Sequence, residues 1–122
     1  MAIEFFVCDG NLIVNEIAPR VHNSGHWSID GAVTSQFENH IRAIAGITLG
    51  STASQPTIML NCIGGMPTAK DLSSLDMLKV HSYNKSARKG RKVGHLNINI
   101  TDETSEYQLL QADKLVKLSQ DM

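Results

Sequence analysis

Short apolar runs, broken by a few polar residues, dominate the start of the chain. Two β-rich runs, residues 3–7 and 12–17, flank Asp9-Gly10, a dipeptide that favours a two-residue hairpin turn. We therefore expect an antiparallel β-hairpin. A strand at an N-terminus that pairs only with its hairpin partner is poorly stabilised. This favours the interpretation that the chain is the tail of a longer protein and that Met1 is an artificial start.

The register of this hairpin decides where two carboxylates lie. A regular ladder from a two-residue turn sets Glu4 opposite Asn15, whereas a bulge or a loop of different length puts Glu4 on the same face as Glu16. Neighbouring carboxylates repel unless a cation lies between them, and Mg²⁺ takes one or two carboxylates together with phosphate oxygens and water. The hydrophobic pattern leaves both registers open.

A helical period replaces the strand period further along the chain. Apolar residues recur at helical spacing between residues 35 and 45, and Thr34 or Ser35 can cap this helix. A segment rich in Gly, Ser and Thr follows, from Leu49 to Pro56, and we place a domain boundary there. The expected domains are residues 1–48 and 49–122.

The second half of the chain is expected to be a small β-rich domain with a final helix. The apolar run at residues 57–63 predicts a central strand, and strict alternation over residues 93–100 predicts a strand with one solvent-facing side. A short helix, a short strand and a long terminal helix are expected at residues 69–75, 79–83 and 102–119. The predicted fold class is α+β.

Composition excludes several classes of partner. The net charge is −1 and the pI about 6.5, so no basic surface for nucleic acid or for an anionic membrane is expected. No apolar stretch is long enough to span a bilayer. Cys8 and Cys62 lie in apolar runs without metal-ligand spacing, which indicates reduced thiols in a cytoplasmic protein.

A polar segment from Asn15 to Trp27 follows the second apolar run. It offers a carboxylate, a guanidinium, two imidazoles, amides and a hydroxyl, in an irregular stretch of the kind that often carries ligand sites. Arg20 and His22 share parity beyond Pro19, and a guanidinium suits a planar anion such as bicarbonate because it donates two parallel hydrogen bonds. A polar loop without a ligand is the competing interpretation.

A second polar cluster, residues 83–92, carries five basic side chains in a chain that is otherwise slightly acidic. Lysine, arginine and loop N–H groups can together bind a phosphate. The alternative is a solvated hairpin tip.

A resemblance to a known family rests on three motifs: the segment from Asn15 to Trp27, Gln36-Phe37-Glu38-Asn39-His40, and Gly90-Arg91-Lys92-Val93-Gly94-His95. The chain is similar to 5-(carboxyamino)imidazole ribonucleotide synthases, the ATPase subunits of phosphoribosylaminoimidazole carboxylase, which are ATP-grasp ligases of purine biosynthesis. The similarity covers nearly the whole chain but only the C-terminal third or so of the family's length. It implies the C-terminal remnant of an ATP-grasp domain, a hairpin plus a helix, followed by a small β-rich domain with a C-terminal helix.

The resemblance also implies a reaction. ATP and bicarbonate give carboxyphosphate, which carboxylates aminoimidazole ribonucleotide. Glu4 and Glu16 match the carboxylates that hold Mg²⁺, with Mn²⁺ as an alternative, on the nucleotide. This match favours the hairpin register in which the two carboxylates converge. The catalytic segment that holds bicarbonate matches Arg20, His22 and Asn23. The substrate 5′-phosphate is matched by Lys85 and Arg91, with Arg88 as a weaker candidate. A homodimer is implied for the full-length enzyme. Many relatives have Pro where this chain has Lys89.

Three interpretations of the chain remain. It is part of the synthase, a non-catalytic module that binds phosphate-ribose or nucleotide ligands, or a structural protein whose site residues are relics. The intact pair of Glu4 and Glu16 argues against relics. No ATP-clamping lid can be built from these 122 residues, so we expect that the chain alone does not hydrolyse ATP.

Overall fold

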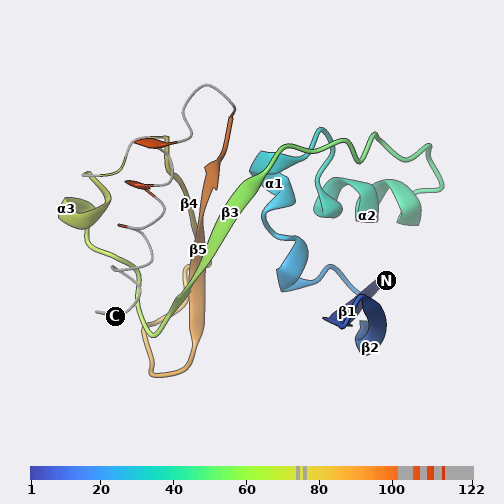
Figure 1. The fold of residues 1–122 in the computed structure, drawn as a ribbon, viewed down its shortest axis with the longest axis horizontal. Helices are drawn as coiled ribbons and strands as arrows, with labels where there is room; N and C mark the ends of the chain where they lie inside the picture. The colour runs from blue at the N-terminus through green and yellow to red at the C-terminus, as the bar shows by residue number, and fades with distance from the viewer. Residues whose placement is uncertain (74, 76, 102–105, 108–109, 112–113, 115–122) are drawn as a thin grey trace. The chain divides into compact units, whose positions relative to one another are not determined.

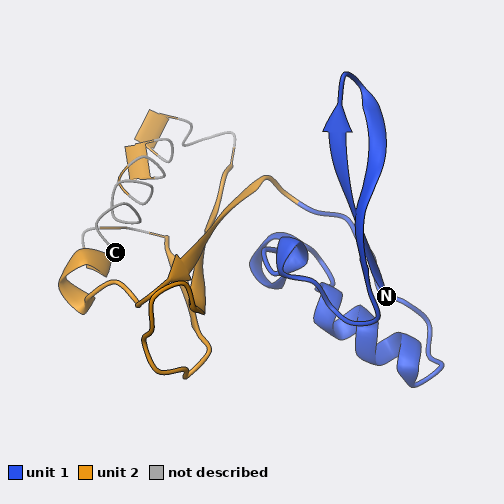
Figure 2. Ribbon diagram, turned by 90° about the horizontal axis from the view of Figure 1, so that it is seen from below, with its two compact units in different colours: residues 1–54 blue, residues 55–122 orange. Residues whose placement is uncertain are grey.

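The computed structural model describes residues 1–73, 75, 77–101, 106–107, 110–111 and 114. The chain divides into two compact units, residues 1–54 and residues 55–122 (Figure 2). Helices and antiparallel sheets occur in the same chain, which confirms the predicted α+β class (Figure 1).

The first unit begins with the predicted hairpin. Strands β1 (Ala2–Cys8) and β2 (Asn11–Ala18) pair antiparallel and form a two-stranded sheet. Asp9 and Gly10 make the turn with φ angles of 50° and 77°. These left-handed angles suit a type I′ turn, whose twist matches that of the two strands.

A bulge in β2 sets the register of this hairpin. Phe5 pairs with Val14 and Glu4 pairs with Glu16, so Asn15 is an extra residue on β2. Of the two registers that the sequence left open, the chain therefore adopts the one that brings the carboxylates together.

Short helical turns connect the hairpin to the longer helix of this unit. They are the 3₁₀ turn η1 (Asn23–Gly25) and α1 (Ser28–Gly31), and they lead to α2 (Gln36–Ile44). Ser35 caps α2, since its Oγ accepts a hydrogen bond from the backbone N–H of Glu38 at 3.1 Å. The cap aligns the first turn of α2 with the loop that precedes it.

The segment after α2 is held against that helix. The backbone N–H of Gly50 donates to Asn39 Oδ1 at 2.8 Å, and Asn39 Nδ2 donates to the Gly50 carbonyl at 3.3 Å. Ala32 and Ser54 form an isolated antiparallel bridge. The Gly-, Ser- and Thr-rich stretch up to Ser54 therefore belongs to the first unit.

The second unit is built on a three-stranded antiparallel sheet. Its strands are β3 (Thr57–Ile63), β4 (Lys79–Ser82) and β5 (Lys92–Asn99), in the order β3-β5-β4, and the short helix α3 (Ala69–Leu72) precedes β4. The prediction that residues 57–63 form the central strand is wrong, because β5 pairs on both sides and β3 pairs with β5 alone among the described strands.

The burial of β5 also differs from the prediction. Residues 93–98 are all buried, including His95 and Asn97 on the side expected to face solvent. The apolar core of this unit centres on the other side of β5, where Leu96 and Ile98 lie with Cys62 and Leu75. The alternating pattern therefore identified the strand but not its position in the middle of the sheet, because polar side chains of a middle strand can be buried by other parts of the protein.

The terminal helix predicted at residues 102–119 falls mostly outside the described residues. Those of its residues that are described, 106–107, 110–111 and 114, are helical. Within the described part of the chain, no helix is both long and apolar enough to cross a bilayer.

Candidate functional site

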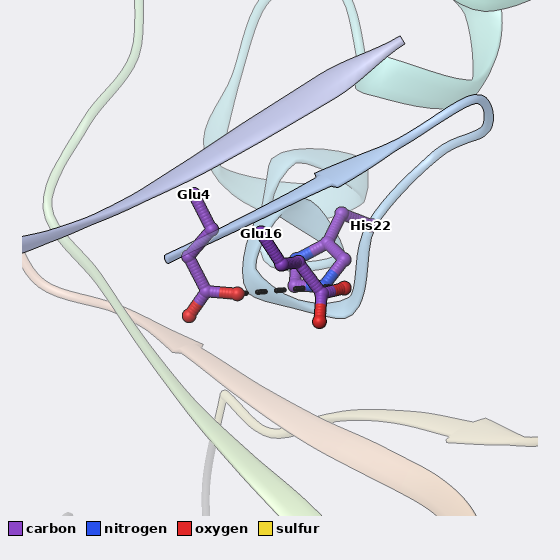
Figure 3. A group of neighbouring side chains, drawn as sticks. All are labelled: Glu4, Glu16 and His22. Carbon is purple, nitrogen blue, oxygen red and sulfur yellow. Dashed lines mark hydrogen bonds and ion pairs between the residues drawn. The ribbon is translucent and has the colours of Figure 1, made fainter. Parts of the chain in front are cut away.

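Glu4, Glu16 and His22 converge beside the hairpin (Figure 3). The paired positions on β1 and β2 direct the two carboxylates to one face, and the chain beyond Pro19 turns back and places His22 against them. His22 Nε2 lies 2.9 Å from Glu16 Oε1 and 3.4 Å from Glu4 Oε2. The imidazole is 16% exposed, and the Glu4 and Glu16 side chains are 34% and 50% exposed. The cluster is therefore open to solvent on its carboxylate side.

Ser24 sets the direction of the His22 ring. The backbone N–H of Ser24 donates to His22 Nδ1 at 3.3 Å, and Ser24 Oγ lies 2.8 Å from the same atom. Because Nδ1 accepts from this N–H, the proton of a neutral ring resides on Nε2. His22 thus presents an N–H to both carboxylates.

The donor set of this cluster fits a divalent cation. The ligand atoms of Glu4, Glu16 and His22 all lie within 4.8 Å of one another, and among the described residues this is the one group of three such side chains. Two carboxylate oxygens are the hard ligands that Mg²⁺ prefers, and Mn²⁺ shares this preference for oxygen. One ion can therefore replace the His22 N–H as the partner of both carboxylates.

Arg20 and Asn23 lie near the cluster in the sequence but make different contacts. Arg20 is exposed, and its Nη1 donates to the Val21 carbonyl at 2.9 Å. Its side chain lines a cavity of about 370 Å³, together with Gln36 and His40 among others. Asn23 Oδ1 is buried and has no hydrogen-bond partner among the described residues. The Arg20 guanidinium is therefore accessible to a ligand, whereas Asn23 Oδ1 is a buried acceptor without a partner in the described contacts.

The basic cluster of residues 83–92 forms the connection between β4 and β5 and ends at the first residue of β5. The carbonyl of Gly64 accepts from the Arg88 N–H at 3.0 Å, and the Gly64 N–H donates to the Arg91 carbonyl at 2.8 Å. Arg91 Nη1 donates to Ser86 Oγ at 3.1 Å, and Lys85 Nζ lies 5.3 Å from the centre of the Tyr83 ring. The backbone of this loop is thus fixed, while Lys85, Arg88 and Lys89 are exposed and Arg91 is half-buried.

Tyr83 anchors the first residue of this loop to the sheet. Its hydroxyl lies 2.8 Å from His95 Nδ1, and the His95 ring stacks on His81 with centroids 4.5 Å apart. Burial raises the pKa of Tyr83, so the hydroxyl keeps its proton for this contact. Burial also lowers the pKa of Lys92, at the end of the loop.

Two family models match the chain. The ATP-grasp domain matches residues 1–37, and the phosphoribosylaminoimidazole carboxylase C-terminal domain matches residues 57–108. N5-carboxyaminoimidazole ribonucleotide synthase of Pseudomonas aeruginosa is 47% identical over 119 residues, which are 96% of this chain and 33% of that protein. The Escherichia coli synthase is 45% identical over 113 residues, 92% of this chain and 32% of that protein. The chain is therefore similar to N5-carboxyaminoimidazole ribonucleotide synthases over nearly its whole length.

Solved synthase structures show the same similarity. The Thermus thermophilus synthetase matches with a TM-score of 0.82 and 44% identity, over 97% of this chain and 32% of that one. A synthase from Aspergillus clavatus, solved with ADP and 5-aminoimidazole ribonucleotide, matches with a TM-score of 0.82 and 32% identity, over 98% of this chain and 34% of that one. The chain thus spans about a third of the length of the synthases that it matches.

The structure brings together some of the predicted site residues and adds others. Glu4, Glu16 and His22 form one cluster, whereas Lys85, Arg88 and Arg91 lie on the loop of the second unit. No role was predicted for Gln36, which lies in one of the family motifs, although its side chain contacts the backbone of His22. Such a contact over fourteen residues leaves no periodic signal in the sequence.

Proposed function

We propose that this chain supplies the metal-binding and bicarbonate-binding part of an N5-carboxyaminoimidazole ribonucleotide synthase, together with its loop for the substrate phosphate. The convergence of Glu4, Glu16 and His22 carries the proposal. The overall reaction is the ATP-dependent carboxylation of aminoimidazole ribonucleotide by bicarbonate through carboxyphosphate. We assign the ATP-grasp part to residues 1–48 and the small C-terminal domain to residues 49–122, although residues 49–54 pack with the first compact unit.

Glu4 and Glu16 are the proposed ligands of Mg²⁺ or Mn²⁺ on ATP. Their carboxylates are paired across the hairpin and are exposed enough to leave coordination positions for phosphate oxygens and water. A bound ion supplies charge neutralisation on the phosphates during phosphoryl transfer. The hairpin holds both carboxylates in place before a ligand arrives, which reduces the cost of ordering them.

Arg20, His22 and Asn23 are the proposed residues for bicarbonate and its phosphorylated product. The Arg20 guanidinium is exposed beside the cavity and offers paired N–H donors to a planar anion. His22 donates from Nε2 on the side of the carboxylates. The buried Asn23 Oδ1 is an acceptor that a bicarbonate hydroxyl can meet.

Lys85 and Arg91, with Arg88, are the proposed contacts of the ribonucleotide 5′-phosphate. Their support is the loop fixed through Gly64, which carries the exposed Lys85 and Arg88 and the half-buried Arg91. The complete enzyme is proposed to be a cytoplasmic homodimer. A non-catalytic module that binds phosphate-ribose ligands is the second candidate, because the basic loop lies on the unit without the carboxylates.

A chimera tests the proposed activity. The matching third of the Escherichia coli synthase is replaced by these 122 residues, and phosphate release dependent on aminoimidazole ribonucleotide and bicarbonate is measured. We expect the chimera to turn over and the Glu16→Gln variant to lose this activity. The Glu38→Gln variant should keep it, because the Glu38 side chain pairs only with Arg42 at the surface of α2 in the contacts described. A second chimera with the Pseudomonas aeruginosa segment controls for the junction. Turnover in that control and none here, with ATP still bound, would support the non-catalytic module.

A further inference from the structure

The side-chain amide of Gln36 holds the backbone of His22. The backbone N–H of His22 donates to Gln36 Oε1 at 3.0 Å, and Gln36 Nε2 donates to the His22 carbonyl at 2.7 Å. One side chain at the start of α2 thus pairs with both backbone polar groups of a residue that contacts the two carboxylates.

These partners fix the orientation of the amide. A backbone N–H can only donate and a carbonyl can only accept, so Oε1 and Nε2 of Gln36 cannot be exchanged. Gln36 Nε2 also lies 2.8 Å from His26 Nδ1. Because the amide NH₂ can only donate, His26 Nδ1 must be the acceptor, and a neutral His26 carries its proton on Nε2.

The surroundings of Gln36 keep it in this place. A Cβ atom added to Gly25 would lie 2.7 Å from Gln36 Oε1, which is closer than such atoms approach. Ser28 Oγ accepts from the Gln36 backbone N–H at 2.9 Å and donates to the Gly25 carbonyl. Backbone and side chain of Gln36 are therefore both tied to the loop that carries His22.

We propose that Gln36 is a positioning residue of the metal-binding and bicarbonate-binding cluster. Its amide fixes the His22 backbone so that Nε2 faces Glu4 and Glu16, and it holds His26 as the Nε2–H tautomer. The importance of this positioning for catalysis rests on the proposed function. The hydrogen-bond pattern itself is independent of that function.

Histidine tautomers provide the first test. In the ¹⁵N-histidine-labelled 122-residue chain, long-range ¹H–¹⁵N spectra report whether each ring nitrogen carries a proton. We expect Nδ1 of wild-type His26 to carry no proton. In Gln36→Glu the carboxylate still accepts from the His22 N–H but cannot donate to His26, so His26 should switch to a protonated Nδ1. Gln55→Glu, at an exposed site in the other unit, should leave His26 unchanged.

Two results of this experiment would overturn the proposal. One is a protonated Nδ1 in wild-type His26, and the other is a His26 ring that is unaffected by Gln36→Glu. Both readings are taken without metal, so they do not depend on whether the chain binds one.

Metal affinity provides the second test. The replacement Gln36→Met keeps the length of the side chain and removes its hydrogen bonds. Supporting partners of a metal site typically contribute about 10–100-fold to affinity, so Mn²⁺ binding should weaken at least about 10-fold, with Gln55→Met unchanged. Wild-type affinity in a folded Gln36→Met variant would overturn the positioning role. A wild-type chain that binds no Mn²⁺ would instead count against the proposed function, and the tautomers would still decide the role of Gln36.

Discussion

Glu4 and Glu16 are paired residues of an antiparallel hairpin, although a regular ladder from the Asp9-Gly10 turn would pair Glu4 with Asn15. One extra residue on β2 makes the difference. The bulge turns Glu16 to the face of Glu4, and His22 then lies within hydrogen-bond distance of Glu16. A backbone irregularity thus creates the cluster on which the proposed function depends.

Cysteine cross-linking tests this register. Directly paired residues have Cα atoms about 4.5–5.5 Å apart, within the range of a disulfide. In a Cys8→Ser background, the double variant Glu4→Cys/Glu16→Cys should therefore oxidise to an intramolecular disulfide, detected by mass spectrometry. Glu4→Cys/Asn15→Cys should oxidise far less, since Asn15 is the extra residue on β2 and has no partner in the ladder. The reverse pattern would indicate a regular ladder.

The basic loop should bind a phosphate weakly. Two cations and loop N–H groups around a dianion predict an affinity in the millimolar range, about −4 kcal/mol, that falls as salt rises. Titration of AMP followed by amide shifts should perturb residues 83–92 in the wild-type chain. Lys85→Ala and Arg91→Ala should each remove most of the effect, and Lys89→Ala, in the same loop, should not. Equal losses in all three variants would indicate nonspecific attraction to charge.

In the complete enzyme the same loop should affect substrate affinity more than turnover. Loss of one charge-assisted contact by Lys85→Ala should cost roughly 1.5–3 kcal/mol. The 5′-phosphate is remote from the amine that reacts, so KM for aminoimidazole ribonucleotide should rise while kcat changes little. Steady-state kinetics of the chimera measure both constants. An unchanged KM in both Lys85→Ala and Arg91→Ala would contradict the assignment of this loop to the substrate phosphate.

The two cysteines should differ in reactivity. Cys8 is exposed, whereas Cys62 is fully buried in the core and burial raises the pKa of its thiol. The thiolate is the reactive form, so Cys62 should resist modification even at mildly alkaline pH. Ellman's reagent should therefore label one thiol in the native chain and both in denaturant. Rapid labelling of both thiols under native conditions would contradict the buried position of Cys62 on β3.

Leu96 should be a main contributor to the stability of the second unit. Its side chain is fully buried in the central strand β5, and Leu→Ala changes at such sites cost about 2–5 kcal/mol. Leu12→Ala, at a side chain that is 67% exposed, should change the free energy of unfolding by less than about 0.5 kcal/mol. Urea unfolding of both variants measures the difference, and similar values would contradict the core assignment.

Local patterns in the sequence predict the elements of this fold well. The Asp9-Gly10 turn, the cap at Ser35 and the apolar run at residues 57–63 depend on neighbours in the chain, and each occurs as expected. The central place of β5 does not follow from such patterns. It depends on pairing with β3 and β4, and a strand that alternates can still be covered on both sides.

The candidate site was predictable in its residues but not in its supports. Carboxylates, imidazole and guanidinium near the hairpin identify Glu4, Glu16, Arg20 and His22 by chemistry and by family motifs. The bulge at Asn15 has no residue signature, so the residue pattern left both registers open and only the family resemblance favoured the one observed. The hydrogen bonds from Gln36 to His22 join distant positions, and only the folded loop reveals them.

Mn²⁺ titration of the ¹⁵N-labelled 122-residue chain tests the central claim most directly, because the paramagnetic ion broadens amide signals close to where it binds. Two carboxylates without nucleotide phosphates leave most of the octahedron to water, so binding should be weak. The account predicts broadening centred on Glu4, Glu16 and His22, its loss in Glu16→Gln and its retention in Glu38→Gln. Broadening centred elsewhere, or tight binding that survives Glu16→Gln, would contradict it.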